Sequence, residues 1–526
     1  MKTVGLIFQL STQLIFFSAG LIYFIACEKP AIKNFQALHR TAVIDPDYSD
    51  TVIPPNIAPL NFMIKEPGEQ FYVEIRSTRG PVIQIFNKKA VVQIPLKKWA
   101  ELLSQNRGEA IQFLIFIQDQ TGQWQQFQPI QNRIATEPID SYLVYRLLKP
   151  VHNLWGELGI YQRTLENFDE SPILINQTID KCCINCHAFC GNHPDRMIIH
   201  TRGKIGVSML VATNREVTKV DTRTRFNSSP AAYPAWHPNG KLLACSVNKL
   251  VQFFHATGES REVTDLASDL ILYQVDTNTV TTVAPISSPD RMETFPAWSP
   301  DGHYLYFCSA PRIESFLTAG QRDLGQIYDK ILYDLNRVRY FPETNSWGEL
   351  ETVLAAAETG QSICFPRISP DGQFLLFCMA RYGSFPIFLP SSDLYLMDLT
   401  NGHYYKPAIN SPQTESFHAW SSNSRWFVFS SKRRDGLCAR PYFCYVDDEG
   451  KVAKPFVMPQ KHPRFYEHFQ STYNIPELIQ EPVKIGWRTF SDAARQKALV
   501  ARLDSRIKSV EEDEPVESFW QPAPHQ

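Results

Sequence analysis

The stretch FPAWSPDG at residues 295–302 recurs along the second half of the chain in recognisable variants. Its relatives are YPAWHPNG at 233–240, FPRISPDG at 365–372 and the more divergent FHAWSSNS at 417–424. Proline presets φ and glycine supplies a positive φ, so Ser-Pro-Asp-Gly predicts a tight turn at the end of a short strand. Four copies of one strand-and-turn unit indicate a repeat architecture.

A strongly apolar strand follows each turn, for example LLACS at 242–246 and YLYFCS at 304–309. These strands are too hydrophobic for a sheet with one solvated face, so they should lie inside a layered array. Later strands of each repeat end in aspartate, as in LILYQVD at 270–276 and DLYLMD at 393–398. Short strands in radial repetition predict a β-propeller.

These repeats resemble the WD40-like repeats of the TolB family, over roughly residues 205 to 460. The copies begin at 233, 295, 365 and 417, so their spacings are 62, 70 and 52 residues. A plain blade needs ~40–45 residues. The resemblance therefore implies further, less visible blades, and we expect about six within residues 205–475.

Residues 40–165 alternate apolar and polar positions in short runs, such as FYVEI at 71–75 and IQFLIFI at 111–117. This pattern predicts an antiparallel β-sandwich of immunoglobulin-like size. One helix is expected from Leu96 to Leu103, where apolar residues recur at helical spacing. The whole fold class is thus predicted as all-β, with an N-terminal sandwich followed by the propeller.

A cysteine cluster falls in residues 166–204, which we interpret as a connector. It contains the sequence CINCH at 183–187, a CxxCH pattern. This resembles the attachment motif of c-type cytochromes. The resemblance implies one covalent haem c, with Cys183 and Cys186 as thioether donors and His187 as the axial iron ligand. The sixth ligand would then be Met197 or His200, with His193 a further candidate.

Two other interpretations of the cluster stay open. Cys182, Cys183, Cys186 and Cys190, with a histidine, also suit a zinc or iron–sulfur site. The same cysteines suit disulfides or free thiols in an exported protein, and Cys182 could pair with Cys190. Three of the remaining cysteines, at 245, 308 and 378, fall at one place in successive repeats and are expected to be small buried hydrophobes.

The chain begins with Met1-Lys2 and an uncharged, mainly apolar run from Val4 to Ala26, followed by Cys27. A small residue and a cysteine at the end of such a run resemble a bacterial lipoprotein processing site, which implies lipidation of Cys27. An uncleaved membrane anchor and a simple secretion signal are the alternatives. Each would export the remainder, so residues 1–27 predict a protein of the bacterial cell envelope facing the periplasm or the cell surface.

The formal net charge of −2 leaves no basic excess for nucleic acid. Residues 476–526 are expected to form a partly disordered tail with an acidic end. Asp45, Asp47 and Asp50 suggest calcium only weakly, and a polar loop is the expected reading. Four polar residues stand at or beside the repeat starts and form either a binding rim or the closure of a blade: Glu293, Arg367, Glu415 and His418.

No catalytic constellation is recognised, so an enzyme is less expected than a carrier or a binding module. The first hypothesis is a membrane-anchored propeller that passes electrons through its haem c to a redox partner in the envelope. The alternative is a propeller lipoprotein that docks a protein or a glycan and whose cysteines are structural. The fold alone does not choose between them.

Overall fold

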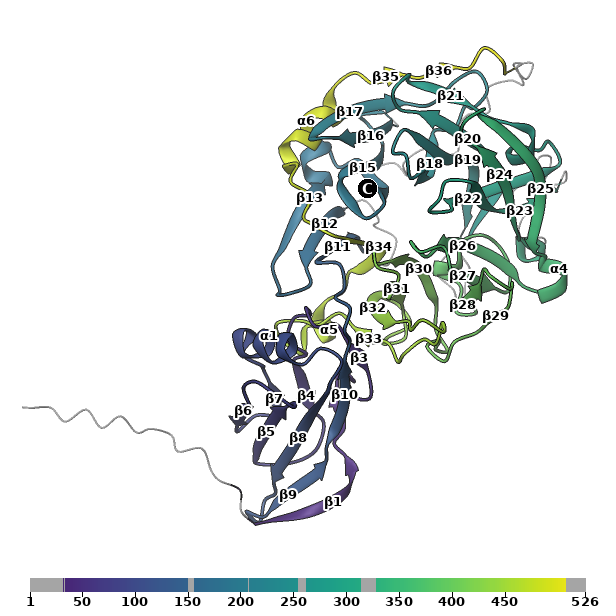
Figure 1. Ribbon diagram of the computed structural model, residues 1–526. Coiled ribbons are helices and arrows are strands. Elements are labelled where there is room, and N and C mark those ends of the chain that lie inside the picture. The colour runs from purple at the N-terminus through teal and green to yellow at the C-terminus, as the bar shows by residue number, and fades with distance from the viewer. Residues whose placement is uncertain are drawn as a thin grey trace, which may run out of the picture.

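A computed structural model of the chain describes Ile32 and residues 34–149, 156–206, 208–253, 262–313 and 328–507. It consists of an N-terminal β domain attached to a ring of sheets (Figure 1). Within the described ranges, no helix combines the length and the apolar character needed to cross a bilayer. The predicted signal or anchor and Cys27 lie outside the described residues.

The N-terminal domain holds a seven-stranded sheet and a three-stranded sheet around one core. The larger sheet comprises β1 (Phe35–Thr41), β3 (Val52–Ile53), β5 (Gln70–Arg76), β6 (Ile83–Asn87), β8 (Ala110–Gln118), β9 (Trp124–Gln128) and β10 (Ile130–Ile134). The smaller comprises β2 (Ile44–Asp45), β4 (Phe62–Ile64) and β7 (Val91–Val92). The predicted helix is confirmed as α1 (Leu96–Gln105), which buries Trp99, Leu102 and Leu103 in this core.

The ring is built from antiparallel four-stranded units, two of which gain a short parallel strand from the C-terminal segment. Their strands, in the order in which they pair, are β13 (Glu170–Ile175), β12 (Gly159–Thr164), β11 (Tyr142–Leu148) and β34 (Thr472–Ile479); β14 (Cys183–Cys190), β15 (His193–Arg202), β16 (Ser208–Thr213), β17 (Glu216–Asp221) and β35 (Leu499–Val500); β18 (Ala231–Trp236), β19 (Leu242–Phe253), β20 (Glu262–Gln274), β21 (Thr279–Thr281) and β36 (Arg502–Leu503); β22 (Arg291–Trp298), β23 (Tyr304–Pro311), β24 (Asp334–Phe341) and β25 (Ser346–Leu354); β26 (Ser362–Ile368), β27 (Phe374–Ala380), β28 (Asp393–Asp398) and β29 (Tyr404–Tyr405); β30 (Glu415–Trp420), β31 (Trp426–Ser431), β32 (Arg440–Tyr445) and β33 (Phe456–Val457). Short helices in the loops are η1 (Asn176–Ile179), η2 (Ala284–Ile286), η3 (Tyr328–Lys330), α4 (Ala356–Thr359), η4 (Pro386–Phe388), α5 (Phe465–His468) and α6 (Trp487–Arg495).

One edge strand of each sheet lies at the centre of the ring, and we call these the inner strands: β14, β18, β22, β26, β30 and β34. Each inner strand contacts the next, and β34 contacts both β30 and β14, so the circle closes. The closure joins distant parts of the chain, because β34 pairs with β11 some 330 residues earlier in the sequence. Sheets arranged radially about a common centre make a β-propeller, which confirms that part of the prediction (Figure 1).

The repeated aromatic residues take the same unusual backbone conformation. Tyr233, Phe295, Phe365 and Phe417 have φ values of 48°, 51°, 54° and 36°, in the left-handed region that bulky residues rarely adopt. Each lies where its inner strand shifts register against the next strand. Their rings contact one another in series, at centroid distances of 4.5, 4.2 and 4.6 Å. Aromatic packing at the ring centre therefore accompanies the backbone strain.

The Ser-Pro-Asp-Gly turns fold as their residues predict. Ser299 Oγ donates to Asp301 Oδ1 at 2.5 Å and accepts the Tyr304 amide at 2.9 Å. Gly302 supplies φ 75°, and its amide donates to the Ser299 carbonyl at 2.9 Å. The same contacts recur at Ser369, in the second Ser-Pro-Asp-Gly turn.

Three predicted segment boundaries differ from the structure. The expected sandwich at 40–165 extends into the ring, because β11 and β12 are ring strands, so the ring begins before residue 205. The expected connector at 166–204 contains β13, β14 and β15, which are strands of the ring. The expected tail from 476 begins within β34, an inner strand of the ring. It continues through α6, β35 and β36, which pack on the outside of the ring. None of these strands carries the repeat motif, and β34, β35 and β36 also pair with strands that are remote in the sequence.

The N-terminal domain and the last sheet of the ring share one core cluster, which includes Trp426 and Phe456. Ion pairs border that contact: Asp45 accepts from Arg434 at 2.8 Å, and Asp47 accepts from Lys454 at 2.7 Å. Burial raises the pKa of both carboxyls, but the neighbouring cations and hydrogen bonds lower it by more. The pKa of each aspartate is therefore below its usual value. Of the three aspartates that weakly suggested calcium, Asp45 and Asp47 thus form a polar contact between the two parts of the molecule.

Candidate functional site

The CxxCH sequence lies in β14, an inner strand of the propeller. Cys183, Cys186 and His187 are each at most 4% exposed. Asn185 and Cys186 together face the single residue His200, because β14 shifts register there against β15. This is the position that the strained aromatics occupy in the other inner strands. Asn185 and Cys186 therefore occupy the place in β14 that the Phe-Pro pair occupies in the repeat strands.

Residues on the two sides of β14 point to different neighbouring sheets. Ile184, Met197 and Ile199 pack in the cluster shared with the β11 sheet, whereas Ala188 and Ile198 pack in the cluster shared with the β18 sheet. The pairing of His187 with Ile199 assigns His187 to the first side.

Electrostatic neighbours agree with this assignment. His187 lies near the backbone of Val144 and Ile475, whereas Cys186 lies near Tyr233 and Cys245 of the β18 sheet. The thiol of Cys186 and the imidazole of His187 thus point to opposite faces of the sheet.

A haem joined to both thiols needs the following histidine under the same ring, on the thiols' face. The arrangement in β14 does not provide this, so the residues do not fit haem c as they lie here. Met197 is fully buried in the apolar cluster on the His187 side, and His200 lies opposite the Asn185–Cys186 bulge.

The two histidines are nevertheless unusual. All four ring nitrogens of His187 and His200 are buried and form no hydrogen bond with the described residues. Burial lowers the pKa of each to about 3, with Arg146 and a second arginine adding to the effect. Both imidazoles are therefore neutral at physiological pH.

The described cysteines are free and buried, including Cys182, Cys183, Cys186 and Cys190. In the described ranges no three metal-ligating side chains come together as a metal group. Cys182 packs on the β11 side, while Cys190 packs on the β18 side with its Sγ 3.7 Å from the His237 carbonyl. Cys245, Cys308 and Cys378 are fully buried, as the repeat pattern predicts.

Three of the four predicted rim residues, Glu293, Glu415 and His418, are buried in the interior of the ring. Glu415 is fully buried and bonds Arg433 at 3.0 Å, Ser411 and Ser431. His418 is 3% exposed, and its Nε2 lies 3.0 Å from the Leu376 carbonyl. Burial raises the pKa of Glu293 to about 8, and its Oε2 has no hydrogen-bond partner among the described residues. Arg367 alone is substantially exposed, 3.9 Å from Glu477.

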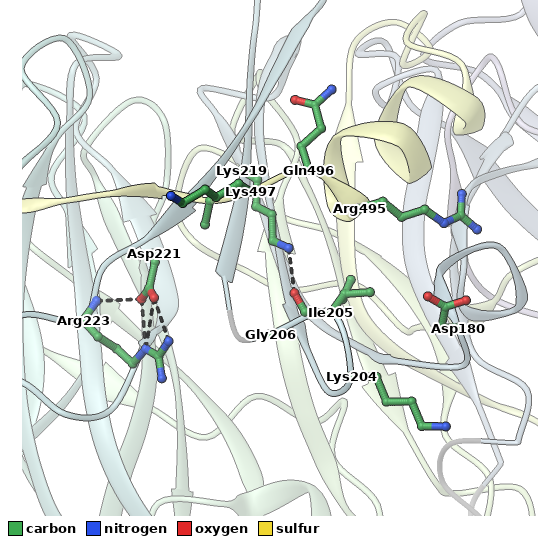
Figure 2. Close-up of a pocket in the computed structure, with 11 residues that line it drawn as sticks. Asp180, Lys204, Ile205, Gly206, Lys219, Asp221, Arg223, Arg495, Gln496 and Lys497 are labelled. Carbon is green, nitrogen blue, oxygen red and sulfur yellow. Dashed lines mark hydrogen bonds and ion pairs between the residues drawn. The ribbon is translucent and has the colours of Figure 1, made fainter.

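A pocket on the outer side of the ring is the clearest candidate for ligand binding (Figure 2). It has a volume of about 490 Å³, and we call it the cationic pocket. It is lined by Asp180, Lys204, Ile205, Gly206, Lys219, Asp221, Arg223, Arg495, Gln496, Lys497 and Ala498.

The C-terminal segment builds half of this pocket. β35 adds to the edge of β17, with Val220 beside Leu499 and Asp221 beside Val500. α6 packs against β13 and β17 immediately before it. This pairing brings Arg495 and Lys497 to Lys219 and to the loop that carries Lys204.

Positive charge dominates the cationic pocket. Asp221 is engaged by Arg223 in a two-point contact at 3.0 and 2.7 Å. Lys219 is 8% exposed, and its Nζ donates to the Ile205 carbonyl at 2.6 Å (Figure 2). The same Nζ donates to the Ala494 carbonyl at 2.7 Å. Burial lowers the pKa of Lys219.

Four of the lining cations form no ion pair within 4.0 Å with a residue that the structure describes: Lys204, Lys219, Arg495 and Lys497. Asp180 is the only lining carboxylate left to balance them. Such an excess favours an anion. Sequence inspection missed the pocket because its cations come from residues 204–223 and 495–497 and form no local motif.

Comparisons with known proteins leave the family open. No protein-family description matches the chain. No curated protein matches it significantly. Solved structures that resemble it include the Dos1 propeller, at 11% identity and TM-score 0.32, covering 53% of this chain and 62% of that one.

Two further matches are also described as propellers. One is the β-propeller domain of the trilobed protease from Pyrococcus furiosus, at 11% identity and TM-score 0.31, covering 73% of this chain and 97% of that one. The other is the Cps50 (Swd1) β-propeller domain of Myceliophteria thermophila, at 8% identity and TM-score 0.30, covering 55% and 70%. Likeness at this level carries no argument about function.

Proposed function

We propose that the chain is a ligand-binding propeller of the bacterial cell envelope that takes an acidic group into the cationic pocket. In this proposal the ring sheets are six blades of TolB-like type, and the N-terminal domain is a sandwich that packs on the last blade. The four turn motifs and the closed circle of inner strands support this assignment.

The observation that carries the proposal is the set of four cations without ion pairs around one cavity. A volume of about 490 Å³ lies in the range of small-ligand sites, which is about 300–1,000 Å³. No aromatic side chain lines the pocket, although aromatic side chains are prominent among the anchors of protein docking sites. A small acidic ligand, of which a uronic acid is one example, therefore suits the pocket better than a protein surface.

Calorimetric titration with glucuronate and with glucose tests this proposal. The acid should bind, and the neutral sugar should bind at least tenfold more weakly, because the recognition is electrostatic. The double variant Lys204→Glu, Lys497→Glu should lose binding while its melting temperature stays unchanged. Lys451→Glu, an exposed lysine in the turn before β33, is the matched control and should bind as the wild type does. Equal affinity in the double variant would contradict the proposal.

The electron-transfer hypothesis remains a prediction without support from the geometry of β14. A partner protein in the envelope, redox-active or otherwise, likewise remains a prediction. In the binding proposal the buried cysteines are structural, as small hydrophobes of the inner blade.

Attachment to the membrane through Cys27 is part of the proposal. It would hold the propeller at the envelope surface, facing the periplasm or the cell exterior. Metabolic labelling with a radioactive fatty acid should mark the wild type and not Cys27→Ser. Labelling that persists in the variant would reject lipidation at this residue.

A further inference from the structure

The outer face of the N-terminal sheet carries a continuous aromatic surface. Phe35 lies 5.5 Å from Phe116, which lies 5.6 Å from Tyr72, and Phe86 lies 6.4 Å from Trp124, all between ring centroids. Phe35 is 43% exposed and Phe86 is 36% exposed. We call these five residues the aromatic face.

Strand register explains why the rings gather on one side. Tyr72 pairs directly with Phe86 on one neighbour and with Phe116 on the other, while Phe35 pairs with Trp124. Alternate residues of the same strands point inward and fill the core of the domain. The sheet is thus apolar on both sides. Its inner side packs in the core of the domain. On its outer side Tyr72 and Phe116 are buried, with Ile32 and Trp124 packed against them, while Phe35 and Phe86 stay exposed.

The position of this surface in the molecule is informative. β1 and β9 lie at the end of the N-terminal domain that points away from the propeller (Figure 1). The predicted membrane segment ends at Ala26, only eight residues before Asn34. Eight residues span at most about 30 Å. A bilayer that holds the preceding segment is therefore within reach of the aromatic face.

The chemistry of the surface suits a bilayer interface. Tryptophan and tyrosine are enriched where a membrane meets water, because each ring has an apolar body and a polar edge. The exposed Lys88 and Lys89 follow Phe86 in the turn after β6, where they can approach anionic headgroups. Glu74 on the same sheet is met by Arg76 at 3.4 Å, so it adds little negative charge.

We propose that the aromatic face rests on the surface of a lipid bilayer and orients the propeller relative to the membrane. The inference rests on the proposed membrane attachment and is independent of the cationic pocket.

Fluorescence quenching in vesicles tests this contact with the full chain. The protein is reconstituted into phosphatidylcholine vesicles that contain phosphatidylglycerol, with and without brominated acyl chains. Brominated lipid should quench part of the tryptophan emission, and Trp124→Phe should remove more than half of the quenched part. Trp487→Phe removes an exposed tryptophan on α6 of the propeller and should leave the quenched part unchanged.

A second variant separates lipid contact from mere proximity. Phe35→Gln with Phe86→Gln removes exposed rings, and it should at least halve the quenching of Trp124 while the circular dichroism spectrum stays the same. Wild-type quenching in Trp124→Phe would overturn the inference. Shielding of Trp124 from both brominated lipid and aqueous acrylamide would also overturn it, because the N-terminal segment or a second copy would then cover the face.

Flotation of the vesicles distinguishes this inference from its premise. A chain that does not float with the vesicles refutes the attachment and the aromatic contact together. A chain that floats but shows no quenching of Trp124 refutes the aromatic contact alone.

Discussion

Glu293 provides a quantitative test of how the interior of the propeller is built. This carboxyl on β22 is 1% exposed, and its Oε2 finds no hydrogen-bond donor among the described residues. Burial and the neighbouring Asp269 raise its pKa from 4.5 to about 8. The folded state therefore favours the protonated carboxyl, and replacing it by the neutral amide in Glu293→Gln should make stability less dependent on pH.

The magnitude follows from linkage between protonation and folding. Because the pKa is higher in the folded state than in the unfolded state, the stability associated with the protonated carboxyl is present below about pH 4.5. It is lost progressively as the pH rises towards 8. At pH 7 the loss amounts to about 3 kcal/mol, at 1.36 kcal/mol per pKa unit, and relaxation of the site will reduce it. Glu293→Gln should therefore match the wild type near pH 4.5 and exceed it by about 2–3 kcal/mol at pH 7.

Urea unfolding at a series of pH values measures this difference. The exposed Glu349→Gln on β25 is the control, and its free energy of unfolding should differ from that of the wild type by a constant amount. A pH-independent difference for Glu293→Gln would refute the reasoning, since it would mean that the carboxyl has the same pKa in the folded and the unfolded protein.

Three further predictions concern the turns, a buried ion pair and the thiols. Gly302→Ala should lower the free energy of unfolding by about 2 kcal/mol or more, because φ is 75° and an added Cβ would lie 2.5 Å from His237 Nε2. Gly360 has a similar φ but open space around it, so Gly360→Ala is the control and should cost about 1 kcal/mol. Thermal unfolding measures both variants. Arg433→Met should lower the free energy of unfolding by about 3–5 kcal/mol, because it leaves Glu415 buried without its cation. Adding Glu415→Gln to this variant should restore most of the lost stability. If the effects of the two substitutions simply add, the prediction is wrong. Iodoacetamide should leave the described cysteines unmodified in the native protein and should alkylate them in denaturant. Mass spectrometry measures the modification. Rapid alkylation of any of these cysteines in the native protein would contradict their burial.

The propeller was predictable because its repeat encodes local chemistry. The Ser-Pro-Asp-Gly turn, its Ser299–Asp301 hydrogen bond and the positive φ of Gly302 are properties of a few adjacent residues. The positive φ of Phe295 was not predictable, because aromatic residues avoid that conformation unless surrounding packing imposes it. The closure of the ring through β34 also depends on a pairing between remote segments.

The candidate sites show the same limit. CxxCH was correctly identified as a distinctive pattern, but its neighbours in space decide whether Cys186 and His187 share a face. In an inner strand they do not. The cationic pocket could not be predicted at all, because Lys204 and Lys497 meet only when the C-terminal segment pairs with β17.

We propose above all that this chain is a binding propeller, in which the CxxCH segment is an inner strand and not a haem attachment site. Pyridine haemochrome analysis of the denatured chain, produced in a host that attaches haem c, tests it most directly. The account predicts no haem on the wild type, the same spectrum as Cys183→Ala with Cys186→Ala, and free thiols at both positions. A haem that stays with the denatured wild type and is absent from the double variant would contradict the account and establish a cytochrome.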